Sequence, residues 1–136
     1  AISLYDWTKA VFDANLFDAD ARIISFTSEG NTKPIQNYGA VSVAKVALEA
    51  ISRQIAVEFA PFGIRSNCIQ AGVTNTISFQ MIPSSEKIKA YVEKRNPFKR
   101  LTNPEDVADV VYLLCKEEAK WITGTIIKVD GGESLQ

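Results

Sequence analysis

Three short runs rich in β-branched and aromatic residues alternate with longer stretches whose apolar residues recur at helical spacing, and this alternation constrains the fold most. The runs predict strands over residues 22–28, 64–70 and 125–129. The other stretches predict helices over residues 4–16, 38–62, 84–94 and 104 to about 116. Strands that alternate with helices build a parallel sheet with helices on both faces. We therefore predict an α/β fold with a doubly wound parallel sheet.

Three parallel strands make an incomplete sheet of this kind. Parallel strands are normally buried between neighbours, and the first strand, residues 22–28, would have a long unpaired edge. A chain of 136 residues has room for one domain. We interpret residues 1–136 as one unit, the second half of a larger domain whose first half is absent. A small self-sufficient α/β domain is the alternative.

Charge, hydropathy and cysteine content exclude several classes of protein. The net charge of −1 does not suggest a nucleic-acid partner, and the apolar runs are too short to cross a bilayer. No signal-like stretch opens the chain. Cys68 and Cys115 lie in apolar runs, which is typical of buried thiols in a reducing compartment. We predict a cytoplasmic protein that binds neither nucleic acid nor membranes.

The chain contains no histidine. This absence removes catalysis by Ser-His-Asp and Cys-His groups and most zinc sites, and we predict no metal site. Any general acid must then be a tyrosine, a lysine or a carboxyl group.

Tyr38 and Lys45 are the strongest candidates for chemistry. Seven residues make almost two turns of a helix, so the two side chains would share one face about 10 Å apart along the axis. A lysine on this face stabilises a phenolate and offers donors to a sugar hydroxyl, while the tyrosine can donate to an oxygen that becomes negative. An ordinary half-buried helix face would have the same spacing.

Two strand ends support a site near this pair. Ser28 ends the first predicted strand, and Ala71 and Gly72 follow the second. Ligands of open parallel sheets bind beyond the carboxyl ends of the strands, so Ser28, Tyr38 and the Gly72 loop would meet at one crevice. The alternative is that these residues only form the turns at the strand ends, which favour the same residue types.

At this point the chain resembles the short-chain dehydrogenase/reductase family over essentially its whole length. The stretches that carry the resemblance are RIISFTS (22–28), KVALEAISRQIAVEFAPFGIRSNCI (45–69), AGVTNT (71–76), RLTNPEDVADVVYLL (100–114) and ITGTIIKVDGG (122–132). The resemblance implies the C-terminal part of a Rossmann-like sheet of three strands with flanking helices, without the N-terminal half.

The spacing of the tyrosine narrows the resemblance. Most of the family has its tyrosine four residues before the lysine, where this chain has Val41. Tyr38 lies seven residues before Lys45, a Tyr-x6-Lys spacing similar to that of the enoyl-acyl carrier protein reductases. Ala71-Gly72 in place of Pro-Gly, and Ser28 ten residues before the tyrosine, also resemble that subgroup.

The resemblance implies a role for each residue. Lys45 would hold the nicotinamide ribose of NADH or NADPH, Tyr38 would hydrogen-bond the enolate oxygen, and Ser28 would assist near the thioester. The remaining cofactor-binding residues would be Gly72, Val73 and Thr74 at the carboxamide and Thr76 towards the phosphates. The residues that touch the substrate would be Tyr38, Val41 and, in a mobile loop over the acyl chain, Ser78, Phe79, Met81 and Ile82.

The implied activity is reduction of enoyl thioesters linked to acyl carrier protein or coenzyme A, in fatty acid synthesis. The resemblance also implies a homotetramer, formed through the predicted helices that begin at Leu4 and Tyr38 and end at Leu16 and Phe62. The alternatives are a carbonyl reductase of the same family and a truncated, non-catalytic oligomerising module. The chain has no glycine-rich turn after a first strand, so we expect these 136 residues alone not to bind dinucleotide usefully. The choice between NADH and NADPH stays open.

Overall fold

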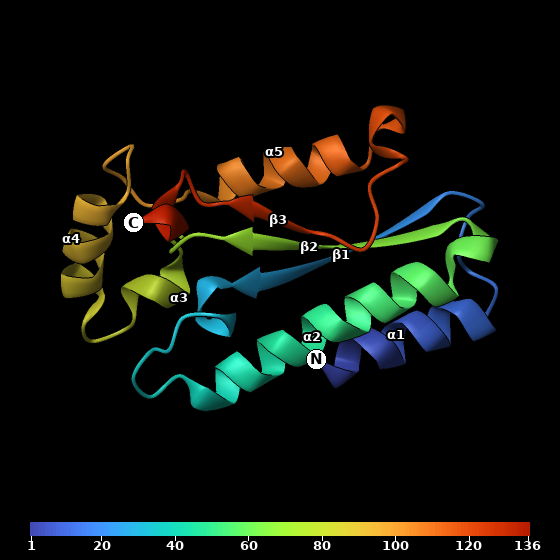
Figure 1. Cartoon of the computed structure of the whole chain (residues 1–136), viewed down its shortest axis with the longest axis horizontal. Helices are drawn as coiled ribbons and strands as arrows, with labels where there is room; N and C mark the ends of the chain where they lie inside the picture. Colours follow the sequence, from blue (N-terminus) through green and yellow to red (C-terminus); the bar gives the residue numbers. More distant parts are fainter.

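A computed structural model describes all 136 residues and contains one parallel sheet of three strands. The strands are β1 (Ala21–Ser28), β2 (Ile64–Ala71) and β3 (Ile126–Val129), and β2 lies between the other two (Figure 1). Ala21 pairs with Ile64 and Cys68 with Ile126. Each strand begins and ends within one residue of its prediction, and the α/β class is confirmed.

Five α-helices accompany the sheet, and two expectations about them were wrong. The helices are α1 (Ile2–Asp13), α2 (Gly39–Glu58), α3 (Ile77–Gln80), α4 (Ser85–Arg95) and α5 (Pro104–Leu114). The helix predicted over residues 38–62 begins after Tyr38 and ends before a separate 3₁₀ turn, Ala60–Phe62. The stretch after β2, expected to be irregular, contains α3 because Thr76 caps its first turn by accepting a hydrogen bond from the Phe79 N–H at 3.1 Å.

The helices form layers on both faces of the sheet (Figure 1). Helix α5 covers the face on which Ile69 packs with Leu114 and Ala119. Helix α2 covers the other face, where Ser52 meets Ser66. Helix α1 lies beside α2, and the Phe12 ring packs edge-on at 4.9 Å from the Phe59 ring. Buried apolar residues therefore lie on both faces, because Ile55 and Ala56 of α2 are also buried.

The two connections between strands differ in hand. The steps from β1 to β2 and from β2 to β3 run in the same direction across the sheet, yet α2 and α5 lie on opposite faces. One connection is therefore left-handed, whereas nearly all such connections are right-handed. The second connection is long enough to change faces because it first passes through α3 and α4.

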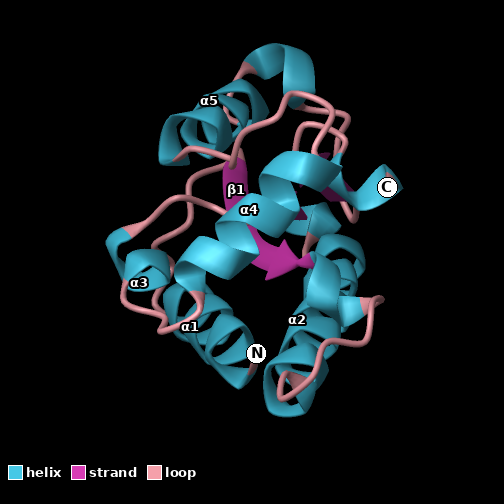
Figure 2. Cartoon of the chain, turned by 90° about the vertical axis from the view of Figure 1, so that its left-hand side faces the viewer, coloured by secondary structure: helices cyan, strands magenta, loops and turns pink.

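Helices α3 and α4 and the C-terminus gather at the carboxyl ends of the strands (Figure 2). Phe79, Val92 and Leu101 form a small buried cluster that joins α3, α4 and the segment before α5. Cys68 is buried as expected, whereas Cys115 is exposed because it caps α5 at its solvent end. None of the helices combines the length and the apolar character that a membrane span requires.

Candidate active site

Ser28 and Tyr38 meet directly at the carboxyl end of β1. Ser28 is the last residue of the strand, and its Oγ lies 3.1 Å from the Oη of Tyr38. Tyr38 has non-helical backbone angles and occupies the position just before α2. Asn37, in the left-handed region at φ 62°, turns the chain immediately before it. Tyr38 is thus the N-cap of α2, one residue before the predicted helix begins in the structure, and its carbonyl accepts a hydrogen bond from the N–H of Ser42 at 2.8 Å.

The absence of a side chain at Gly30 leaves room for the ring of Tyr38. A Cβ atom at residue 30 would lie 2.3 Å from Cε1 and 2.6 Å from Cδ1 of Tyr38. Any side chain there would displace the ring from Ser28. The turn Glu29–Asn31 thus needs a glycine at its centre because of close packing.

Glu49 of α2 fixes both sides of this turn. Its carboxylate Oε1 accepts hydrogen bonds from the hydroxyl of Thr27 and the side-chain amide of Asn31. The residue is 7% exposed. Sequence reasoning did not select Glu49, whereas it selected Val41 of the same helix, which is exposed.

Lys45 contacts β1, the strand that ends in Ser28. Its Nζ donates to the backbone carbonyl of Phe26 at 2.8 Å. Phe26 lies two residues before Ser28 in β1. The structure thus brings Ser28 and Tyr38 into contact and places the Lys45 ammonium beside the strand that presents them.

The loop after β2 approaches this end of the sheet from its middle strand. The N–H of Gly72 donates to Val129 at 3.1 Å, and the carbonyl of Val73 accepts from the N–H of Thr102 at 3.1 Å. The Thr74 hydroxyl donates to the carbonyl of Gly72 at 2.9 Å. The backbone N–H of Thr74 takes part in no backbone hydrogen bond. The loop is therefore held in place with one main-chain donor free.

The predicted acyl-covering residues lie in different environments. Phe79 is 8% exposed and packs against Val92 and Leu101, whereas Met81 is 78% exposed. Ser78, Val41 and Ile82 are also exposed. The roles assigned to these residues, and to Thr76 at the phosphates, stay predictions.

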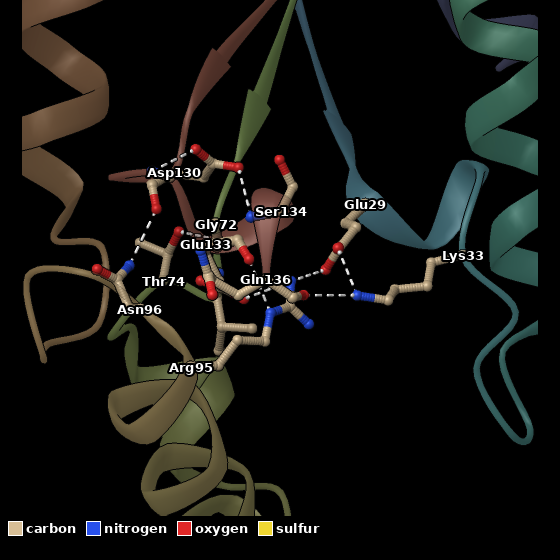
Figure 3. A network of polar contacts seen from close by, with 12 residues as sticks. Glu29, Lys33, Gly72, Thr74, Arg95, Asn96, Asp130, Glu133, Ser134 and Gln136 are labelled. Atoms are coloured by element: carbon tan, nitrogen blue, oxygen red, sulfur yellow. Dashed lines mark hydrogen bonds and ion pairs between the residues drawn. The ribbon is translucent and has the colours of Figure 1, made fainter.

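A polar network that sequence reasoning did not select joins the strand ends (Figure 3). Arg95, at the end of α4, forms ion pairs with Glu29 and, at 3.7 Å, with Glu133. Lys33 pairs with the other oxygen of Glu29 at 3.1 Å. The sequence feature that could have pointed to this network is Glu133, an acid directly after the two glycines that follow β3.

The pKa values of the acids in this network are shifted in different directions. Burial raises the pKa of Glu133, and the opposing hydrogen bond from Val73 and charge of Arg95 do not cancel this effect. Burial also acts on Asp130, but hydrogen bonds from Ser134 and Gly132 bring the pKa of that carboxyl below its usual value. Hydrogen bonds from Arg95 and Lys33 likewise outweigh burial and lower the pKa of Glu29.

Comparisons with known proteins show the family to which the chain belongs. The family model described as enoyl-(acyl carrier protein) reductase matches residues 1–134. Dehydrogenase/reductase SDR family member 4 of Sus scrofa is 36% identical over 92% of this chain and 45% of its own length. The NADH-dependent enoyl-[acyl-carrier-protein] reductase FabI of Bacillus cereus is 32% identical over 96% of this chain and 52% of its own length.

A solved structure shows the same fold. The promiscuous reductase LugOII, described as catalysing keto-reduction at C1 during lugdunomycin biosynthesis, is 29% identical with a TM-score of 0.86. The match covers 100% of this chain and 52% of that one. The chain thus spans about half the length of the relatives it matches. It belongs to the enoyl-(acyl carrier protein) reductase family, within the short-chain dehydrogenases/reductases.

Proposed function

We propose that this chain is the C-terminal part of an NADH- or NADPH-dependent reductase that saturates the 2,3 double bond of enoyl thioesters in fatty acid synthesis. The substrate would be linked to acyl carrier protein or coenzyme A. The observation that carries the proposal is the 3.1 Å contact between Ser28 and Tyr38, seven residues before Lys45. The family match supports the reaction class.

The position of Tyr38 suits reduction at a carbon remote from the oxygen. Reduction of an enoyl thioester delivers hydride to carbon 3, and negative charge develops on the thioester oxygen, which is three bonds away. The Tyr38 hydroxyl would donate a hydrogen bond to that oxygen as its charge grows. Ser28, 3.1 Å away, would orient the hydroxyl and assist at the thioester.

The residues present fit the nicotinamide half of a dinucleotide. Gly72 leaves no room for a Cβ, which would lie 2.6 Å from the Thr102 Oγ1, so the close packing of the loop requires a glycine at this position. The free N–H of Thr74 offers a donor for the carboxamide. The Lys45 ammonium would hold the ribose hydroxyls. The bound cofactor would supply hydride, and Thr76 would face its phosphates.

The test uses the intact enzyme with crotonyl and acetoacetyl thioesters and both cofactors. We expect turnover of the crotonyl thioester and a fall in kcat of roughly 10²–10⁴-fold for Tyr38→Phe, which removes the donor. Tyr91→Phe, at an exposed tyrosine of α4, is the matched control and should leave kcat unchanged. Turnover of the acetoacetyl thioester alone would contradict the proposal.

That contrary result would identify a carbonyl reductase. The similarity to a structure described as a keto-reductase is the observation that favours this second candidate. In that case Tyr38 would serve an oxygen on the carbon that receives hydride.

The chain by itself gives a separate prediction. Because it has no glycine-rich turn for a pyrophosphate, we expect no tight binding when the isolated 136 residues are titrated with NADH or NADPH. Fluorescence of the reduced nicotinamide reports binding directly. Micromolar affinity would contradict the expectation.

We also propose a homotetramer that forms through α1 and α2. Both helices expose large apolar side chains, namely Ile2, Tyr5, Trp7, Val41, Val43, Val46 and Val57. Analytical ultracentrifugation of the intact enzyme should give a tetramer, and Trp7→Lys should shift it to smaller species. Stable assembly of the isolated chain without any reductase activity in the intact protein would favour a non-catalytic module.

A further inference from the structure

Glu133 is a buried acid beside the loop that follows β2. It is 2% exposed and is the first residue of the turn Glu133–Leu135, entered through Gly132 in the left-handed region at φ 79°. Its Oε2 accepts a hydrogen bond from the backbone N–H of Val73 at 3.2 Å. A Cβ on Gly72 would come within 2.8 Å of the same oxygen. The carboxylate therefore packs directly against the Gly72–Val73 turn.

Arg95 holds Glu133 from the other side (Figure 3). Its Nε donates to the Glu133 backbone carbonyl at 2.8 Å, and its Nη2 lies 3.7 Å from the carboxylate Oε1. Arg95 is also paired with Glu29, the residue after Ser28. A continuous set of polar contacts thus joins the segment next to Ser28 to the loop after β2.

A buried carboxylate is costly unless its partners compensate. Here burial raises the pKa of Glu133, and Arg95 and the Val73 N–H only partly oppose that effect. The N–H of the neighbouring Gly72 donates to a backbone carbonyl, that of Val129, at 3.1 Å, whereas the N–H of Val73 does not. A side chain instead supplies the acceptor, and it reaches the loop from the C-terminal end of the chain.

We propose that Glu133 is a positioning residue that fixes the Gly72–Val73 turn so that the Thr74 N–H faces the nicotinamide carboxamide. This inference rests on the proposed function, because it takes the loop to be part of the cofactor site. Glu133 acts through Val73. Its loss should therefore weaken cofactor binding more than it slows turnover of bound substrate.

The first measurement is amide hydrogen exchange of the intact enzyme without substrate, which requires no reaction. In Glu133→Ala, exchange at Val73 should accelerate about ten- to a hundredfold relative to the Ile69 amide in the central strand. Glu133→Gln keeps an acceptor oxygen and should give an acceleration of only a few fold. The matched control is Glu86→Gln, which removes one negative charge at an exposed site of α4 and should change neither amide.

The second measurement is titration of the intact enzyme with NADH and NADPH. Glu133→Ala should raise the Kd of the preferred dinucleotide about tenfold while kcat at saturating cofactor falls less than threefold, and Glu133→Gln should recover most of the affinity. Unchanged exchange at Val73 would overturn the inference. Faster exchange at Val73 with an unchanged Kd would also overturn it, since Glu133 would then be purely structural.

Two outcomes separate this inference from the proposed function. If the enzyme reduces enoyl thioesters equally well in all Glu133 variants with unchanged Kd, the inference alone fails. If it binds dinucleotide in the expected order but reduces no enoyl thioester, the proposed function alone fails. Should Glu133→Ala unfold, as equal acceleration at Val73 and Ile69 would reveal, Glu133→Gln decides. A selective few-fold effect at Val73 with a raised Kd supports the inference, and its absence overturns it.

Discussion

The two faces of the sheet are built from different chemistry. Under α5 the contacts are apolar, with Ile69 in contact with Leu114 and Ala119. Under α2 they are mixed, because buried Ile55 and Ala56 are accompanied by the paired hydroxyls of Ser52 and Ser66 and by Glu49 at the strand end. The difference teaches that the α5 face is held by non-directional contacts, whereas the α2 face adds hydrogen bonds that fix the directions of side chains. The directional face is the one that presents Ser28 and Tyr38.

A physical reason connects this division with function. Apolar contacts are non-directional and tolerate small shifts, whereas a hydrogen bond loses strength over a few tenths of an ångström and tens of degrees. A reacting hydroxyl must be aimed, so side chains that hold the turn Glu29–Asn31 by hydrogen bonds suit the α2 face. The predictions below test this division, from the largest expected effect to the smallest.

The strongest test of the apolar face is Ile69→Ala. Ile69 is 0% exposed, and its truncation leaves a cavity between β2 and α5. We expect the free energy of unfolding to fall by about 2–5 kcal/mol, as measured by urea denaturation. Ile77→Ala removes the same atoms from an exposed site and should cost under about 0.5 kcal/mol. Equal losses at the two sites would show that the α5 face does not carry the burial.

The substitution Glu49→Ala tests the hydrogen bonds on the α2 face. This change leaves the Thr27 hydroxyl and the Asn31 amide without their acceptor, so we expect a loss of about 1–3 kcal/mol in unfolding free energy. Because the turn carries Gly30 and the Tyr38 ring, kcat of the intact enzyme should also fall. Glu58→Ala, at an exposed acid of the same helix, is the control. A Glu49→Ala enzyme with normal kcat would refute the directional role of this face.

The parts of the structure that can be predicted from the sequence also differ between the two faces of the sheet. The strands were predicted to within one residue because β-rich runs such as 64–70 are bounded by turn residues and have an unambiguous local pattern. The contacts under α5 can be predicted from the sequence for the same reason. Tyr38 was misplaced because helix pattern alone cannot show that Asn37 turns the chain just before α2.

The buried acids escaped prediction for a different reason. Glu49 is buried by contacts with β1 and Asn31, and Glu133 by contacts with Val73 and Arg95. These partners are distant in the sequence, so no local window contains the signal. Tyr38 and Ser28 were selected from local features, because Tyr38 lies seven residues before Lys45 and Ser28 ends the first predicted strand.

The smallest expected effect lies at the hydroxyl pair in the middle of the polar face. Ser52 and Ser66 are both buried, with their Oγ atoms 2.8 Å apart. Ser52→Ala and Ser66→Ala should each cost about 1 kcal/mol in unfolding free energy, because each leaves a buried hydroxyl without its partner. The double variant should cost less than the sum of the two, since it removes both polar groups together. Strict additivity would mean that the hydroxyls are independently satisfied, and the α2 face would then owe its geometry to packing, as the α5 face does.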